Sequence, residues 1–155
     1  MKEYNSVSEP FLADVRAVVG DANVFTEPEK LEQYKTDEEY DPRRFRVPEA
    51  VVRPANAEEI AAVVKLCNKY NVPLTVRSGG TSLADGAIAV CGGIVLLMER
   101  LNKIIEMNTE AMYVVAEAGV RTVDIQKMAN KAGYLYAGDP CSAESCLIGG
   151  NLATN

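Results

Sequence analysis

The sequence predicts an α+β fold in which a parallel βαβ lobe is followed by a mixed or antiparallel lobe. A strand over 51–53, a helical segment and a second strand over 74–77 follow one another at βαβ spacing, which predicts parallel strands joined by a right-handed crossover. Later strands over 104–107 and 113–118 flank an Asn-Thr pair at 108–109, which predicts an antiparallel hairpin. The length of 155 residues fits one domain.

Before the βαβ unit, residues 9–19 predict an amphipathic helix on the outside of the fold. Ser8 is suited to cap its start, Pro10 fits its first turn, and Gly20 ends it. Over 21–46 no hydrophobic period is sustained, so we expect a mostly irregular segment. Three aromatic side chains are expected to pack this segment onto the core, with the lining of a pocket as the alternative: Tyr34, Tyr40 and Phe45.

The helix of the βαβ unit follows Pro54, which ends the first strand. Asn56 is placed to cap this helix, and Glu58 and Glu59 favour its first turn through the helix dipole. The apolar residues that share one helical face are Ile60, Val63, Val64, Cys67 and Tyr70. We expect this face to pack against the sheet.

Residues 94–98 predict a buried strand, because all of them are apolar. Thr122 is expected to cap a further helix, which ends at Gly133. The inward side chains of that helix are expected to be Ile125, Met128 and Ala129. Since parallel and antiparallel strand pairs both occur, we expect the sheet to be mixed.

Composition and charge exclude several classes of function. A net charge of -6 and a pI of 4.8 argue against a protein that neutralises nucleic-acid phosphates. No stretch of 18 apolar residues and no signal-peptide pattern occurs, so we expect no transmembrane segment and a cytoplasmic location. The cysteines lack metal-site spacing and are expected to be free thiols, with no metal bound: Cys67, Cys91, Cys141 and Cys146.

The chain contains no histidine. No Ser-His or Cys-His nucleophile pair can therefore form within it, and no histidine of this chain can act as general base or carry a covalently attached flavin. The sequence names no catalytic residue, and we expect any proton-transfer group to lie elsewhere.

The first loop of small residues follows the strand over 74–77 and runs to Gly86. Its centre, Gly79-Gly80-Thr81-Ser82, lets several backbone N–H groups approach a phosphate while hydroxyls add donors, which predicts a nucleotide cofactor. The pattern differs from the Walker and Rossmann motifs. Arg77 is either a phosphate partner or an edge-strand arginine in an ion pair. A plain glycine turn would use the same residue types.

The second loop of small residues covers 139–155. Two glycines followed by Asn at a helix start let the backbone approach a flat ring or a phosphate, and the Asn amide offers both a donor and an acceptor. The candidate ligand-binding residues of this loop are Pro140, Ser142, Ser145, Gly149, Gly150, Asn151, Ala153 and Thr154. Cys141 and Cys146 are either packed small residues or redox thiols beside a flavin. A glycine-rich connector is the alternative for the whole loop.

Short blocks of this sequence occur in the order and spacing of a known family. The blocks cover 48–54, 73–82, 92–95, 101–102, 118–120, 138–140 and 148–151. Together they resemble the N-terminal part of the PCMH-type FAD-binding domain of the vanillyl-alcohol oxidase / p-cresol methylhydroxylase family. The branch that they resemble most contains D-lactate dehydrogenase and the GlcD-type flavoprotein of glycolate oxidase, and the resemblance extends from about residue 34 to residue 155.

The resemblance implies an FAD-dependent oxidoreductase that removes hydride from C2 of a D-2-hydroxy acid, such as glycolate or D-lactate, and gives the 2-oxo acid. In the first loop it implies that the FAD pyrophosphate is held by Arg77, Ser78, Gly79, Gly80, Thr81 and Ser82. In the second loop it implies contact with the isoalloxazine ring and ribityl chain by Pro140, Ser142, Ser145, Gly149, Gly150, Asn151 and Ala153. An electron-transfer flavoprotein, a quinone and an iron-sulfur partner are each compatible electron acceptors.

Two departures from the family pattern accompany the resemblance. Many relatives have glycine at the position of Ser78, and glycine or serine near Asp85. The family's FAD domain continues well beyond residue 155 and is followed by a substrate-capping domain, so we expect residues 1–155 to be the N-terminal part of a single FAD-binding domain, inactive alone.

Two other functions remain open at this point. One is the FAD subunit of a different oxidoreductase, such as a molybdenum hydroxylase or the cell-wall enolpyruvyl reductase. The other is a flavin-binding module or accessory subunit without activity of its own. Bleaching of bound flavin by a hydroxy acid separates these functions from the first.

Overall fold

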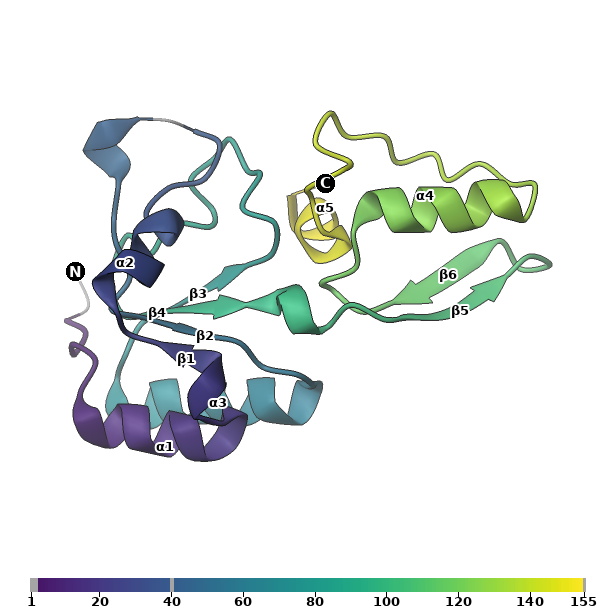
Figure 1. Cartoon of the computed structure of the whole chain (residues 1–155). Helices are drawn as coiled ribbons and strands as arrows, with labels where there is room; N and C mark the ends of the chain where they lie inside the picture. Colours follow the sequence, from purple (N-terminus) through teal and green to yellow (C-terminus); the bar gives the residue numbers. More distant parts are fainter. Residues whose placement is uncertain (1–2, 40, 155) are drawn as a thin grey trace.

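The computed structural model describes residues 3–39 and 41–154, so the predicted packing of Tyr40 lies outside the described residues. Two lobes are visible in Figure 1. The first lobe contains α1 (Glu9–Val19), β1 (Val24–Phe25), α2 (Pro28–Leu31), β2 (Ala50–Val52), α3 (Ala57–Tyr70), β3 (Leu74–Arg77) and β4 (Ile94–Leu97). The second contains β5 (Ile104–Asn108), β6 (Tyr113–Ala116) and α4 (Thr122–Lys131), and α5 (Ile148–Thr154) lies between the two lobes (Figure 1).

The sheet of the first lobe has four strands in the order β1-β2-β4-β3. β2 and β3 both run parallel to β4, with Val51 and Thr75 opposite Val95 from its two sides. The predicted βαβ unit is therefore present, but β4 is inserted between its two strands. This order makes β3 an edge strand, which leaves one side of it open for a ligand.

The expectation of one mixed sheet is wrong in its cause. β5 and β6 form a separate antiparallel sheet, and the four-stranded sheet is mixed because β1 pairs antiparallel with β2. β1 lies in the segment that we expected to be mostly irregular, which also contains the short helix α2 and three-residue helical turns. An element of two residues such as β1 is too short to produce a hydrophobic period.

The core of the first lobe lies on both faces of β4. Ile94 and Leu96 belong to the larger cluster, which includes Phe11 of α1 and Val63 of α3, while Val95 and Leu97 pack in a smaller cluster with Leu31 of α2. Figure 1 shows α1 and α3 together on one face of the sheet and α2 on the other. All four residues of β4 are buried, as the continuous apolar run predicted.

The ends of the helices agree with the sequence in position more than in mechanism. Asn56 caps α3 as predicted, because its Oδ1 accepts from the N–H of Glu59 at 2.8 Å, and the Glu59 carboxylate accepts from the N–H of Ala55 at 2.7 Å. Ser8 occupies the N-cap of α1, but its side chain makes no capping hydrogen bond. Thr122 is the first residue of α4 rather than its cap, and its buried hydroxyl serves the site described below.

The predicted apolar face of α3 is narrower than expected. Val63 and Cys67 are buried, whereas Val64 is 39% exposed. Val64 lies about 100° around the helix from Val63, which places it at the margin of the face that contacts the sheet. The hairpin also differs by one feature, since Asn108 pairs with Tyr113 and the loop is the four residues 109–112.

The second lobe has its own small core. Val120, Ile125 of α4 and Ile148 of α5 are buried together, with Val114 of β6 and Tyr136 packed against them. None of the helices within residues 3–39 and 41–154 combines the length and the apolarity that crossing a bilayer requires.

Replacement of Asn56 by Ala is expected to lower the free energy of unfolding by about 1 kcal/mol, because the first turn of α3 loses the side-chain acceptor for the Glu59 N–H. Urea unfolding followed by circular dichroism measures this loss. Asn68→Ala, an exposed position in the last turn of the same helix, is the matched control and is expected to change stability by a few tenths of a kcal/mol. Equal effects of the two substitutions would contradict the capping role.

The four free thiols are expected to react in two classes. Cys91 and Cys141 are exposed, whereas Cys67 and Cys146 are buried, and burial raises the pKa of Cys67 to about 11. At pH 8 only about one Cys67 in a thousand would therefore be a thiolate, the reactive form. Labelling of the native protein with a thiol reagent, followed by mass spectrometry, should modify Cys91 and Cys141 rapidly and the other two only after unfolding. Rapid native labelling of Cys67 would show that the α3 face is open.

Candidate functional site

The two loops of small residues meet in one cleft of about 750 Å³. The first loop leaves the carboxyl end of β3, and the second leads into α5. The predicted site residues that line the cleft are Ser78, Gly79, Gly80, Thr81, Ser82, Pro140, Ser142, Gly149, Gly150, Asn151 and Ala153. Thr154 lines it as well, whereas Arg77 and Ser145 are not among the lining residues. Two loops distant from each other in sequence thus share one site.

Gly79 allows the loops to approach each other this closely. A Cβ atom added at Gly79 would lie 2.6 Å from the carbonyl oxygen of Ser145 and 3.1 Å from the Cα atom of Cys146. Both are backbone atoms, which cannot move aside without moving the second loop. Ser145 therefore serves as a contact between the loops through its carbonyl group, and its hydroxyl hydrogen-bonds back to the Ser142 carbonyl at 3.3 Å.

The glycine at position 80 has a different reason. Its φ of +70° belongs to the left-handed region, and an added Cβ would collide with the guanidinium group of Arg77. That guanidinium group donates from Nη1 to the Thr36 carbonyl at 2.7 Å and lies over the Tyr34 ring at 5.7 Å. Arg77 thus supports the loop from outside the cleft lining, and contact of its side chain with a phosphate stays a prediction.

Burial lowers the pKa of the Arg77 guanidinium, and the nearby charge of Asp37 acts in the opposite direction. Asp37 is buried, and its Oδ2 has no hydrogen-bond partner among the described residues. The positive charge of Arg77 therefore lies beside a buried carboxylate, which offsets part of the cost of removing both groups from water.

The first loop offers unpaired backbone donors to the cleft. Within the described part of the chain, the N–H groups of Gly79, Gly80, Thr81 and Ser82 donate no hydrogen bond. Successive free N–H groups in a loop with a positive φ are suited to bind phosphate oxygens. The loop therefore fits the pyrophosphate of a dinucleotide cofactor.

The second loop differs, because its backbone is already satisfied. The N–H groups of Ile148, Gly149, Gly150 and Asn151 donate to carbonyl oxygens of residues 120, 118 and 147. An added Cβ at Gly149 would lie 2.8 Å from the Ala118 carbonyl oxygen, so this glycine is needed for packing against the second lobe. The second loop can thus offer side chains and a flat backbone surface to a ligand, but few amide donors.

Asn151 also has a narrower role than the sequence indicates. Its Nδ2 donates to the buried hydroxyl of Thr122 at 2.5 Å, and the Cys146 thiol donates to the same oxygen at 3.2 Å. The Asn151 amide therefore holds α5 against α4 with its donor and keeps its oxygen as an acceptor for the cleft. Cys146 is a packed residue, as one of the two alternatives predicted, and Cys141 is exposed.

Sequence reasoning missed part of the cleft. The apolar wall formed by the edge strand and the following segment contains Leu74, Val76, Ile88 and Val90. These residues lie at the cleft because β3 is an edge strand, and the insertion of β4 that places it there leaves no local sequence signal. Asp85 was also missed as a site residue, although it directly precedes Gly86 in the same loop.

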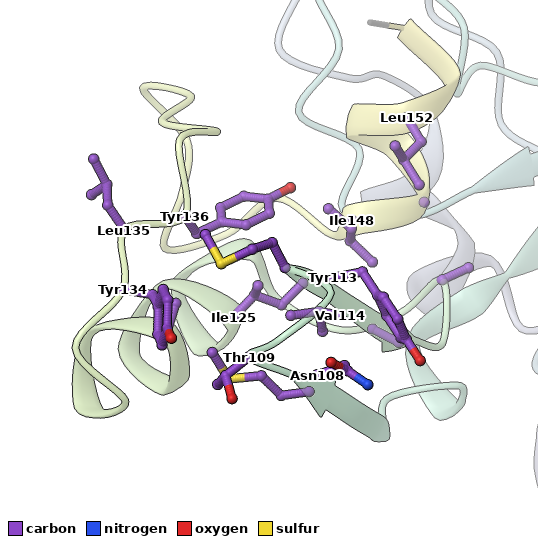
Figure 2. Close-up of a pocket in the computed structure, with 16 residues that line it drawn as sticks. Asn108, Thr109, Tyr113, Val114, Ile125, Tyr134, Leu135, Tyr136, Ile148 and Leu152 are labelled. Carbon is purple, nitrogen blue, oxygen red and sulfur yellow. The ribbon is translucent and has the colours of Figure 1, made fainter.

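A second, apolar pocket of about 380 Å³ lies within the second lobe. Figure 2 shows Val114 of β6, Ile125 of α4, Ile148 of α5 and Tyr136 around it. It shares Gly149 with the cleft and has no charged residue in its lining. Such a pocket suits an apolar group and not a phosphate. Among the described residues, no group of three or more Cys, Asp or Glu side chains could hold a metal ion.

Comparison with known proteins agrees with this geometry. Residues 48–155 match the family model described as "FAD binding domain". The chain is 34% identical over 114 residues to glycolate oxidase subunit GlcD of Bacillus subtilis, a match that covers 74% of this chain and 24% of that protein. It is 39% identical over 108 residues to D-lactate dehydrogenase of Anaerostipes hadrus, covering 70% of this chain and 22% of that protein.

A third relative matches nearly the whole chain. D-2-hydroxyglutarate dehydrogenase of Xanthomonas citri pv. viticola is 34% identical over 149 residues, which is 96% of this chain and 31% of that protein. The chain therefore spans less than a third of the length of these curated relatives.

Solved structures share the fold. Alkyldihydroxyacetonephosphate synthase superposes with a TM-score of 0.83 and 21% identity, over 98% of this chain and 33% of that one. p-Cresol methylhydroxylase superposes with a TM-score of 0.68 and 24% identity, over 82% of this chain and 26% of that one. The α+β fold of a PCMH-type FAD-binding domain is thereby confirmed, and FAD is the cofactor that the cleft fits. The chain belongs to the FAD-binding domain family of FAD-linked oxidoreductases of the vanillyl-alcohol oxidase / p-cresol methylhydroxylase type.

Proposed function

We propose that this chain is the FAD-binding part of an oxidoreductase that converts a D-2-hydroxy acid, such as glycolate or D-lactate, into the 2-oxo acid. The observation that carries the proposal is the identity of 34–39% to three relatives whose names contain glycolate, D-lactate and D-2-hydroxyglutarate. All three are 2-hydroxy acids, so the shared chemistry is oxidation at C2. The choice among these acids is left to the test.

In the proposed reaction the C2–H bond breaks with its electron pair, and the hydroxyl group loses a proton as the carbonyl forms. FAD supplies the hydride acceptor for this step when it is bound. The part of this chain is to orient the cofactor: the free N–H groups at 79–82 bind its diphosphate, and the Gly149-Gly150 surface borders its ring system. Since the chain contains no histidine, no imidazole from these residues takes the hydroxyl proton.

The proposal also includes an electron acceptor and a location. Two electrons must leave the reduced cofactor in each turnover, and an electron-transfer flavoprotein, a quinone or an iron-sulfur protein would each accept them. We place the reaction in the cytoplasm. The acidic composition and the absence of an apolar run of bilayer length in the sequence support this placement.

Replacement of Gly79 by Ala is expected to weaken FAD binding about tenfold or more, which corresponds to at least about 1.4 kcal/mol. The new Cβ would meet the Ser145 carbonyl oxygen at 2.6 Å and force the two loops apart. Titration of FAD into the chain, followed by quenching of flavin fluorescence, measures the affinity. Gly86→Ala is the matched control in the same cleft, because its added Cβ meets nothing nearer than Ser82 Oγ at 3.9 Å. Unchanged affinity of the Gly79 variant would show that the loops do not form a joint site.

Anaerobic addition of a D-2-hydroxy acid is expected to bleach FAD in a protein that joins this chain to the substrate-capping region implied by the family. Residues 1–155 alone, loaded with FAD, are expected to show no bleaching. D-Lactate, glycolate and D-2-hydroxyglutarate are compared in a stopped-flow spectrophotometer, with L-lactate as the stereochemical control. If none of the D-acids reduced the flavin, hydroxy-acid oxidation would be excluded, and a different FAD-linked oxidoreductase would become the better assignment.

A further inference from the structure

Asp85 introduces a negative charge into the cleft that has to accept a diphosphate. Among the described residues that line this cleft, Asp85 is the one with an ionised side chain, and no lysine or arginine lines it. Its Oδ1 is shielded from solvent and has no hydrogen-bond partner within the described residues. A carboxylate beside a diphosphate repels it, and a largely buried charge is poorly screened by salt.

Arg44 forms an ion pair with this carboxylate. Its Nη1 donates to Asp85 Oδ2, and its Nε lies 3.8 Å from Asp41 Oδ2. Arg44 ends a short helical turn, Pro42–Arg44, which is capped at its start by Asp41 through a 3.0 Å bond from the Arg43 N–H. Arg44 is thus brought to the cleft by a segment distant in sequence from the glycine loop.

The segment that carries Arg44 is fixed against the glycine loop at two further points. The N–H of Glu38 donates to the Ser82 carbonyl at 3.1 Å, and the Arg77 guanidinium donates to the Thr36 carbonyl at 2.7 Å. The Arg46 N–H donates to the Lys35 carbonyl at 2.9 Å, which closes residues 35–46 into a loop of its own. The ion pair between Arg44 and Asp85 therefore joins two segments that are already held in register.

We propose that Arg44 is a positioning residue for the cofactor, which neutralises Asp85 so that the cleft accepts the negative diphosphate of FAD. The pair gives the cleft wall no net charge, and the free N–H groups at 79–82 then bind the phosphates without an opposing carboxylate. This matters in a chain whose net charge is -6. The inference rests on the FAD assignment and is independent of which substrate is oxidised.

A set of variants separates charge neutralisation from direct contact between Arg44 and a phosphate. FAD affinity is measured by fluorescence titration of residues 1–155 at low salt. Arg44→Ala is expected to weaken binding about tenfold, Asp85→Asn to bind at least as tightly as the parent, and the double variant to match Asp85→Asn. Arg43→Ala is the matched control, because this neighbouring arginine is 88% exposed and pairs with Asp41.

Two further measurements exclude a purely structural role. The deficit of Arg44→Ala is expected to shrink at high salt, since screening weakens the repulsion. Riboflavin, which has no phosphate, is expected to bind Arg44→Ala and the parent equally. Thermal unfolding of each variant verifies that it is folded before titration.

The outcomes that would overturn the proposal are specific. A double variant as weak as Arg44→Ala would mean that Arg44 contacts the phosphate directly. An equal loss of FAD and riboflavin affinity in Arg44→Ala would mean that the ion pair only orders the loop. Absence of FAD binding by the parent chain would overturn the proposal together with the role assigned to the loop. Failure of every hydroxy acid to bleach the flavin would leave it intact, because no substrate enters these titrations.

Discussion

The structure of the site depends on the close approach of Gly79 to the backbone at Ser145 and Cys146. This contact joins the end of an edge strand in the first lobe to the segment that begins α5, and α5 packs in turn against the second lobe through Gly149 and Ala118. A side chain at position 79 would separate the two lobes where the cleft lies. The cleft is therefore a property of the interface between the lobes, and neither loop forms it alone.

The two loops divide the work of binding by the state of their backbones. The first keeps the N–H groups of residues 79–82 free, so it can meet phosphate oxygens without any positive side chain in the cleft lining. The second uses its N–H groups internally and presents small residues, which permits close contact with a flat ring. An acidic chain can bind a dinucleotide in this way, because backbone dipoles add no net charge.

The sequence predicts the parts of the fold that have a local cause. The period of α3 and its Asn56 cap, the continuous apolar run of β4 and the hairpin can each be read from neighbouring residues. The insertion of β4 between β2 and β3 and the pairing of the two-residue β1 depend on contacts distant in sequence. For the same reason, the sequence indicates which loops hold the ligand but not what each residue does there. Gly79 serves a contact between loops, Arg77 lies outside the cleft lining, and the Asn151 donor is used by Thr122.

The support behind the glycine loop bears directly on affinity. A loop of small residues loses much conformational freedom when a ligand orders it, and this cost is subtracted from the binding free energy. Here the loop is held in advance by the Arg77 guanidinium against Gly80, by the Glu38 N–H on the Ser82 carbonyl and by the pair between Arg44 and Asp85. All three contacts lead to residues 36–44, outside the loop itself. Because the free N–H groups are fixed before the phosphate arrives, more of their interaction with it is retained as affinity.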